Sequence, residues 1–184
     1  ASTATPGESE EQYSERCAKN LDALIEQEGP ETVAAFIAEP VMGAGGVLIP
    51  PAGYFKKIQA VLNKHDVLMI ADEVICGFGR TGNMWGSETF NINPDIITCA
   101  KALSSGYIPI SALMINETVY QPIAEQSAEI GSLGHGFTYS GHPVAAAVAL
   151  ETLDIYEELN LVKMVQAIAP ALQSGILGFS DHSL

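Results

Sequence analysis

Three ionisable side chains in this sequence each come directly after a short apolar run. Glu39 follows residues 33–38, Asp72 follows residues 67–71, and Lys101 follows residues 96–100. Such runs are typical of buried parallel strands, and ligands of parallel sheets bind outside the carboxyl ends of the strands. Burial at a strand end would partly desolvate Lys101 and lower its pKa toward the neutral amine that attacks carbonyl groups. The three positions therefore predict one site that combines a nucleophilic amine with carboxylates.

The pair Asp72 and Lys101 has the chemistry that pyridoxal 5'-phosphate requires. The lysine forms a Schiff base with this cofactor, and a carboxylate keeps the pyridine nitrogen protonated so that the ring withdraws electrons. Further hydroxyl and imidazole groups could contact a phosphate, namely Ser104, Ser105, Thr138, Ser140 and His142. The residues alone leave simpler readings open, because Asp72 could be a helix cap or turn residue and Lys101 a lysine whose stem covers apolar surface.

Two other kinds of site are less well supported. Residues 77–82 match the G-x-G-x-x-G fingerprint of dinucleotide-binding proteins, but four residues separate Asp72 from Gly77 and no helical stripe follows Gly82. The histidines at positions 65, 135, 142 and 182 show no ligand-like spacing, and the three cysteines, Cys17, Cys76 and Cys99, form no C-x-x-C pair. We therefore expect neither a nicotinamide or flavin site nor a metal.

The elements that must position these residues alternate between helical and strand patterns. Ser9 and Gln12 form a capping box before a predicted helix over residues 13–25, and a second amphipathic pattern covers residues 51–63. Strands are predicted at 33–38, 67–71, 96–100 and 110–115, and later helices at 118–125, 144–157 and 161–173, with an interruption at Pro170. Fully apolar strands indicate an α/β fold, with a largely parallel sheet that helices flank on both faces.

Composition limits the possible partners and location. The 184 residues carry a net charge of −14, with 47% hydrophobic and 16% charged residues, which suits a globular domain that binds neither nucleic acid nor an anionic membrane. An odd number of cysteines fits a reducing compartment, and the acidic start of the chain does not resemble a targeting segment. No apolar run reaches the roughly 20 residues that span a bilayer. These features predict a cytoplasmic protein.

Four segments together resemble consecutive motifs of the class III, or omega-, aminotransferases, which have PLP fold type I. They read AEPVMGAGGVLIPPAGY, IADEVICGFGRTG, NPDIITCAKALSSGYIPISA and HGFTYSGHPVAAAVALE. The resemblance implies that Lys101 forms the internal aldimine and shuttles the proton, that Asp72 pairs with the pyridine nitrogen, and that Val74 packs against the ring. It also implies a homodimer in which Thr138 reaches the phosphate in the neighbouring subunit. Glu39 matches a glutamate on the substrate side that pairs with a mobile arginine.

The same resemblance also has implications for the reaction and for the extent of the domain. Ile75 replaces a glutamine of many relatives and Ala102 a glycine, which favours the subgroup that moves an amino group from an amine or omega-amino acid to pyruvate. Relatives are more than twice as long, so residues 1–184 match a central, partial PLP-binding large domain without the phosphate-cupping loop or the small domain. Two alternatives stay open: a cofactor-free, inactive fragment or interaction module, and another class III activity such as an aminomutase, racemase or decarboxylase.

Overall fold

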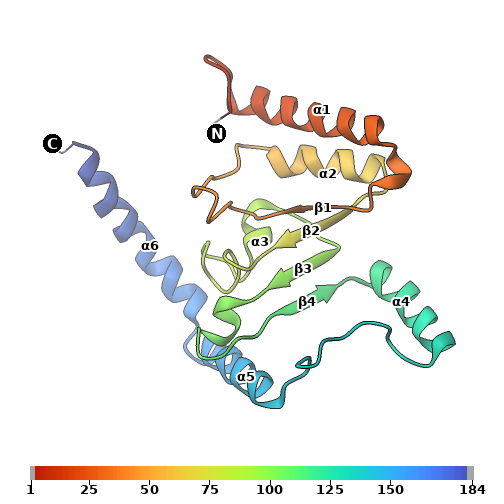
Figure 1. Cartoon of the computed structure of the whole chain (residues 1–184). Helices are drawn as coiled ribbons and strands as arrows, with labels where there is room; N and C mark the ends of the chain where they lie inside the picture. Colours follow the sequence, from red (N-terminus) through yellow and green to blue (C-terminus); the bar gives the residue numbers. More distant parts are fainter. Residues whose placement is uncertain (1–2, 182–184) are drawn as a thin grey trace.

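The computed structural model describes residues 3–181 and contains a four-stranded sheet of order β1-β2-β3-β4 (Figure 1). Strands β1 (Ala35–Ala38), β2 (Leu68–Asp72) and β3 (Ile96–Cys99) are parallel, and β4 (Ala112–Ile115) runs antiparallel to β3. The predicted α/β class with a largely parallel sheet is thereby confirmed. The carboxyl ends of the three parallel strands lie at one edge of the sheet.

Helices α1 (Glu10–Glu28) and α2 (Tyr54–Lys64) pack together on one face of the sheet (Figure 1). Their apolar stripes bury Ile25, Ile58 and Leu62 against Met69 of β2, with 1 to 2% of each residue exposed. Burying an aliphatic side chain of this size stabilises a fold by roughly 1.5–3 kcal/mol. This core holds β1 and β2 in place. It thereby positions the carboxyl ends of these strands, where Glu39 and Asp72 lie.

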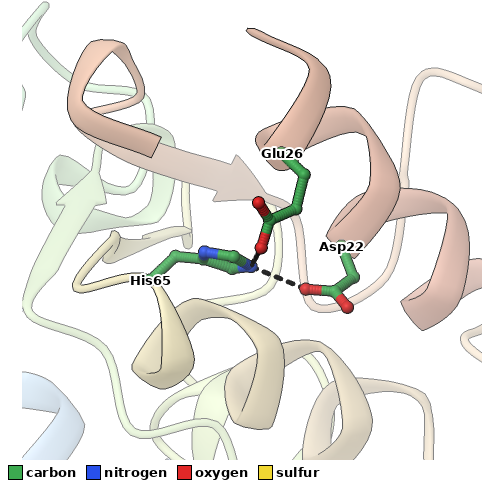
Figure 2. Close-up of side chains that lie close together, drawn as sticks. All are labelled: Asp22, Glu26 and His65. Carbon is green, nitrogen blue, oxygen red and sulfur yellow. Dashed lines mark hydrogen bonds and ion pairs between the residues drawn. The ribbon is translucent and has the colours of Figure 1, made fainter. Parts of the chain in front are cut away.

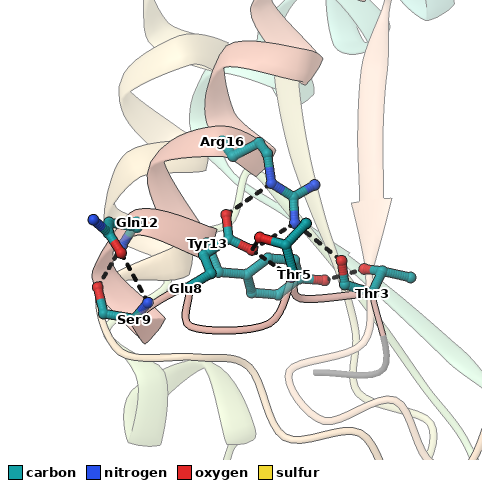
Figure 3. A network of polar contacts seen from close by, with 7 residues as sticks. All are labelled: Thr3, Thr5, Glu8, Ser9, Gln12, Tyr13 and Arg16. Carbon is teal, nitrogen blue, oxygen red and sulfur yellow. Dashed lines mark hydrogen bonds and ion pairs between the residues drawn. The ribbon is translucent and has the colours of Figure 1, made fainter.

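A network of polar contacts, shown in Figure 3, stabilises the start of α1 and the segment before it. The predicted capping box is confirmed, because the Ser9 hydroxyl accepts the Gln12 backbone N–H and the Gln12 side chain accepts the Ser9 backbone N–H. Arg16 donates to both carboxylate oxygens of Glu8 at 2.8 Å and lies over the ring of Tyr13. The segment before α1 is thus held by charge and hydrogen bonds rather than by apolar burial.

A second, smaller core lies on the same face at the β3–β4 side of the sheet. It contains Cys99, Leu103 and Ala149, the last from helix α5 (Pro143–Glu158), with Phe78 and Trp85 packed against them. The short helix α3 (Gly86–Phe90), which the sequence did not predict, follows Trp85 directly. Because Ala149 and Leu103 share this core, helix α5 packs against the 3-10 helix η2 (Lys101–Ser104), which begins at the candidate lysine.

The opposite face of the sheet is open within residues 3–181. Strand register places Ile37, Ile70 and Ile96 side by side on this face, and Leu113 lies one pair further along it. Ile37 is 60% and Leu113 65% exposed. The expectation that helices cover both faces was therefore wrong for the described residues, as was that of a buried first strand, because β1 is an edge strand that α1 and α2 cover on one side only.

The helices of the C-terminal half are longer than expected. Helix α4 (Glu117–Ile130) passes through Pro122, and α6 (Leu161–Leu177) continues through Pro170 without the interruption that the sequence predicted. Proline removes one backbone donor and leaves the carbonyl four residues earlier without its helical partner. Because Pro170 and Gln166 are both exposed, water can bond that carbonyl, and the helix persists. Two short 3-10 helices, η1 (Pro30–Thr32) and η3 (Gly178–Asp181), complete the described chain.

One helical stretch, Leu161–Ser180, is long and apolar enough to cross a membrane by length and composition alone. The expectation that no stretch would reach this length was therefore wrong. A single helix of this kind is weak support for a membrane span, because helices that pack into the cores of soluble proteins satisfy the same test.

Candidate functional site

Asp72 is the last residue of β2 and lies on the open face of the sheet, in register with Thr98 of β3. Its side chain is half-buried, and Oδ1 accepts the backbone N–H of Val74 at 3.1 Å. This local bond turns the chain sharply after the strand and sets the orientation of the carboxylate. Within residues 3–181 Asp72 forms no ion pair, so the carboxylate is available to a cationic group.

Lys101 begins the turn that follows β3, the strand adjacent to β2. Its backbone has a φ of 48°, in the left-handed region that costs a non-glycine residue roughly 1–2 kcal/mol. The surrounding turn holds this conformation, because Leu103 and Ser104 are buried, Ser104 Oγ donates to the Ile108 carbonyl at 2.6 Å, and Tyr156 Oη donates to the Ala102 carbonyl at 2.7 Å.

The Lys101 side chain is exposed, and no carboxylate among residues 3–181 pairs with it. The sequence predicted partial desolvation, and this is not what the described chain shows. The reason is that the open face of the sheet has no cover beside the end of β3. The adjacent parallel strands β2 and β3 nonetheless carry Asp72 and Lys101 to the same edge, as the sequence predicted.

Glu39 and Val74 belong to the same edge of the sheet. Glu39 follows β1 and is half-buried, and its Oε2 accepts the Gly43 backbone N–H at 2.9 Å. A cavity of about 470 Å³ lies beside it, between the ends of β1 and β2 and helices α1 and α2, and is lined in part by Glu39 and Asp72. Val74 is half-buried in the turn after β2. Glu39 and Asp72 therefore line one cavity, and Lys101 follows the adjacent strand β3 at the same edge of the sheet.

Thr138 lies apart from these residues. It is exposed in the loop between α4 and α5, inside a turn in which the Ser140 N–H donates to the Phe137 carbonyl and the Phe137 N–H donates to Ser140 Oγ, both at 2.9 Å. A cavity of about 720 Å³ beside this turn is lined by residues of the loop, of α5 and of the segment before β4, but by neither Asp72 nor Lys101. Within one chain, Thr138 is not brought to the other candidate residues.

The glycine-rich segment after Asp72 does not have the geometry of a dinucleotide fingerprint. Gly79 and Gly82 have φ values of +89° and +92°, and the Gly82 N–H donates to the Gly79 carbonyl at 3.0 Å. The next helix is α3, which begins only at Gly86 and has five residues. A phosphate-binding fingerprint needs a helix that starts directly after the glycines, because the helix N-terminus supplies the binding amides. The segment instead folds back toward β2.

A comparison with known protein families gives one match that covers nearly the entire chain. The profile described as "Aminotransferase class-III" matches residues 2–183. This chain belongs to the class III aminotransferase family. Enzymes of this family depend on pyridoxal phosphate, and the resemblance noted in the four sequence motifs is thereby confirmed.

Individual members of the family are highly similar to this chain. It is 61% identical over 179 residues to "Gamma aminobutyrate transaminase 3, chloroplastic" of Solanum lycopersicum, covering 97% of this chain and 34% of that protein. It is 58% identical to the "Vanillin aminotransferase" of Capsicum frutescens, covering 97% of this chain and 39% of that one. The chain thus spans between a third and two fifths of the length of these curated relatives.

The fold is also shared with solved class III structures. The omega transaminase of Pseudomonas jessenii, solved in complex with PMP, is 58% identical to this chain and superimposes with a TM-score of 0.94. The match covers 97% of this chain and 40% of that one. The arrangement of β1, β2 and β3, with Asp72 and Lys101 at their ends, is therefore that of a transaminase fold.

A cluster that the sequence did not predict lies between α1 and the end of α2, just before β2 begins. Figure 2 shows His65 pointing toward Asp22 and Glu26, with Nε2 at 2.6 Å from Asp22 Oδ1 and 3.8 Å from Glu26 Oε1. The Lys64 ammonium also contacts these carboxylates, at 2.8 Å from Asp22 and 3.5 Å from Glu26. The Lys64 and His65 side chains lower the pKa of Asp22.

Lys64 supplies a positive charge that pairs with both carboxylates. We therefore interpret this cluster as a set of ion pairs that joins α1 to α2. Of the other histidines, His135 and His142 lie in or next to the exposed loop before α5. His182 lies outside the described residues.

Proposed function

We propose that this chain is part of a PLP-dependent aminotransferase that moves an amino group from an amine or omega-amino acid to a 2-oxo acid such as pyruvate. The observation that carries the proposal is the placement of Asp72 and Lys101 at the ends of adjacent parallel strands, in a chain that matches class III enzymes over residues 2–183. Neither residue has an ion-pair partner among residues 3–181, which suits groups that await a bound cofactor.

Each residue has a distinct role in this proposal. When bound, pyridoxal phosphate supplies an electron sink for the carbon next to the substrate nitrogen. Lys101 holds the cofactor covalently and moves the proton at that carbon, and Asp72 keeps the pyridine nitrogen protonated. Val74 packs against the ring, and Glu39 lies toward the substrate. Residues 1–184 would then contribute the central part of a PLP-binding large domain.

Mapping the modified lysine tests the assignment of Lys101. The chain would be incubated with pyridoxal phosphate, reduced with borohydride and digested, and the pyridoxyl group located by mass spectrometry. We expect it on Lys101, since Lys19, Lys57 and Lys64 are held in ion pairs by carboxylates. A Lys101→Arg variant is the matched control and should take up no label. A pyridoxyl group on any other lysine of the wild-type chain would contradict the proposal.

The proposed donor and the proposed acceptor rest on different observations. The relatives are named for gamma-aminobutyrate and vanillin, and they share the class III fold rather than one donor. The pyruvate preference rests on Ile75, where many relatives have glutamine. Comparing pyruvate with 2-oxoglutarate as acceptor in the same preparation would test it, and faster turnover with 2-oxoglutarate would contradict it.

We propose a homodimer in which Thr138 contacts the cofactor phosphate bound by the other subunit. Support comes from the exposed turn around Thr138 and from its distance from Asp72 and Lys101 within one chain. Mixing Lys101→Ala with Thr138→Ala subunits would create dimers with one doubly damaged and one intact site. Recovered activity is expected, and mixed dimers no more active than either variant alone would contradict the role of Thr138.

Two alternatives make different predictions. A cofactor-free interaction module would give no visible absorption band with pyridoxal phosphate and no transfer from an amine to pyruvate. An aminomutase, racemase or decarboxylase would carry the pyridoxyl group at Lys101 but yield other products, which chromatography separates.

The cytoplasm remains our prediction for the cellular compartment of this protein, although one relative is named as chloroplastic.

A further inference from the structure

Glu73 is a buried carboxylate that the proposed chemistry does not use. It lies between Asp72 and Val74, and 0% of the residue is exposed. Its backbone N–H donates to the Thr98 carbonyl of β3, and its carbonyl accepts the Gly77 N–H, both at 2.9 Å. Burying a carboxylate is costly unless its oxygens are hydrogen-bonded, so the partners of this side chain indicate what it does.

Both carboxylate oxygens of Glu73 accept backbone N–H groups from the start of α3. Gly86 N–H donates to Oε2 at 2.9 Å, and Ser87 N–H donates to Oε1 at 2.6 Å. These are the first two residues of α3, whose amides have no partner within the helix. The side chain therefore joins the end of β2 to a helix that begins 13 residues later and closes the intervening glycine-rich loop.

The contact around Gly86 leaves no room for a side chain. A Cβ atom there would lie 2.7 Å from Cys76 Cβ and 2.8 Å from Pro40 Cβ. Cys76 in turn bonds the backbone of Val41, accepting from its N–H and donating to its carbonyl, both at 3.4 Å. The loop after β1 and the turn after β2 are thus packed directly against the start of α3, which the Glu73 carboxylate bonds.

This anchoring reaches Asp72 through one hydrogen bond. The backbone N–H of Val74, the residue after Glu73, donates to Asp72 Oδ1. Fixing the Glu73 side chain and backbone fixes the position of the Val74 N–H, and that N–H orients the Asp72 carboxylate. We propose that Glu73 is a positioning residue for Asp72 and Val74, a role that rests on the proposed function of those two residues toward pyridoxal phosphate.

Glutamine cannot replace Glu73 in this role. Both oxygens of the carboxylate accept an N–H, whereas one end of a glutamine amide is itself a donor. Glu73→Gln would therefore leave one buried N–H of α3 facing another donor. Glu88 provides a matched control, since it lies on the same helix, is exposed, and accepts the Trp85 N–H at 3.0 Å.

Two measurements test the inference. First, amide hydrogen exchange in the cofactor-free chain should become about tenfold or more faster at Ser87 and Val74 in Glu73→Gln, but not in Glu88→Gln. Second, pyridoxal phosphate should bind Glu73→Gln about tenfold more weakly, and adding Asp72→Asn to Glu73→Gln should weaken binding much less than Asp72→Asn weakens it in the wild-type background. If Glu73→Gln does not fold by circular dichroism, Glu73→Asp, too short to reach both amides, replaces it in both measurements.

The outcomes separate this inference from the proposed function. Unchanged exchange at Val74, or additive effects of the two substitutions on binding, would overturn the positioning role of Glu73 while leaving Lys101 and Asp72 as proposed. A wild-type chain that takes no pyridoxyl group at Lys101 would overturn the proposed function, and with it the role of Glu73 toward the cofactor.

Discussion

The turns that follow β2 and β3 differ from the loop of residues 131–142 in how they are held. The turns are anchored by the side chains of Glu73, Ser104 and Tyr156, which bond backbone groups of residues 86–87, 108 and 102. The loop is exposed at every position, and its one side-chain bond to backbone lies within the turn from Phe137 to Ser140.

The difference shows which parts of the site one chain can organise alone. Asp72 and Lys101 are placed by strand pairing and buried hydrogen bonds, so their relative position is built into this chain. Thr138 has no comparable support within residues 3–181, which is expected if a second subunit orders its loop. A site divided in this way should respond very differently to substitutions in its two halves.

The largest effect is expected from Asp72→Asn. The substitution keeps the shape of the side chain and removes its charge, so the pyridine nitrogen would lose its proton and the ring its electron-withdrawing strength. Losing a charge-assisted contact of this kind costs about 2–4 kcal/mol, or roughly 30- to 1,000-fold in the rate of amino transfer from an amine to the bound cofactor. Stopped-flow absorbance would measure that rate.

Asp66→Asn is the control for this prediction. Asp66 is exposed and has a φ of 55°, a conformation that asparagine tolerates well. The Asp66→Asn variant should transfer the amino group at the wild-type rate. A rate within threefold of wild type for Asp72→Asn would argue that another group protonates the ring.

Two glycines compare the anchored and exposed regions directly. Gly86→Ala would place Cβ within 3 Å of Cys76 and Pro40 and should destabilise the fold by about 1–3 kcal/mol or more. Gly136→Ala in the loop meets nothing within 4 Å and should change stability by less than about 0.5 kcal/mol. Urea denaturation measures both. Equal effects of the two substitutions would contradict the contrast between the regions.

Much of this contrast could be predicted from sequence, and part could not. Apolar runs that end at Asp72 and Lys101 predicted their position at one sheet edge, since parallel pairing follows from short buried strands. The anchoring could not be predicted, because Glu73 bonds Gly86 and Ser87, 13 and 14 positions further along the chain, without a periodic signal. The open face was also missed: the apolar strands suit a covered sheet, and the sequence does not say whether residues 3–181 supply that cover.

A smaller effect is expected at the turn of Lys101. The Tyr156 hydroxyl, which is protonated at neutral pH, donates to the Ala102 carbonyl, and burial raises the pKa of Tyr156 further. Tyr156→Phe removes this bond and should cost about 0.5–1.5 kcal/mol in the free energy of unfolding. Tyr107→Phe is the control, because Tyr107 is 86% exposed. A change no larger than that of the control would show that η2 is held without the phenol.

The smallest effect is expected at the segment before α1, which is anchored by charge and so depends on pH. Arg16 and the Thr5 N–H hold the pKa of Glu8 at about 2, below its ordinary value of 4.5. A carboxyl whose pKa is lowered by folding stabilises the folded state above pH 4.5, and this contribution is lost as the pH falls from 4.5 toward 2.

NMR would follow the Glu8 carboxyl shift and the Thr5 amide through this range. We expect a midpoint near pH 2 in the wild-type chain, and one shifted upward toward 4.5 in Arg16→Gln, where Glu8 keeps its bonds to Thr5 but loses Arg16, the partner shown in Figure 3. Lys19→Gln on the same helix should leave the midpoint unchanged, since Lys19 pairs with Glu15. A wild-type midpoint near 4.5 would mean that the segment is held no more firmly than the loop of residues 131–142.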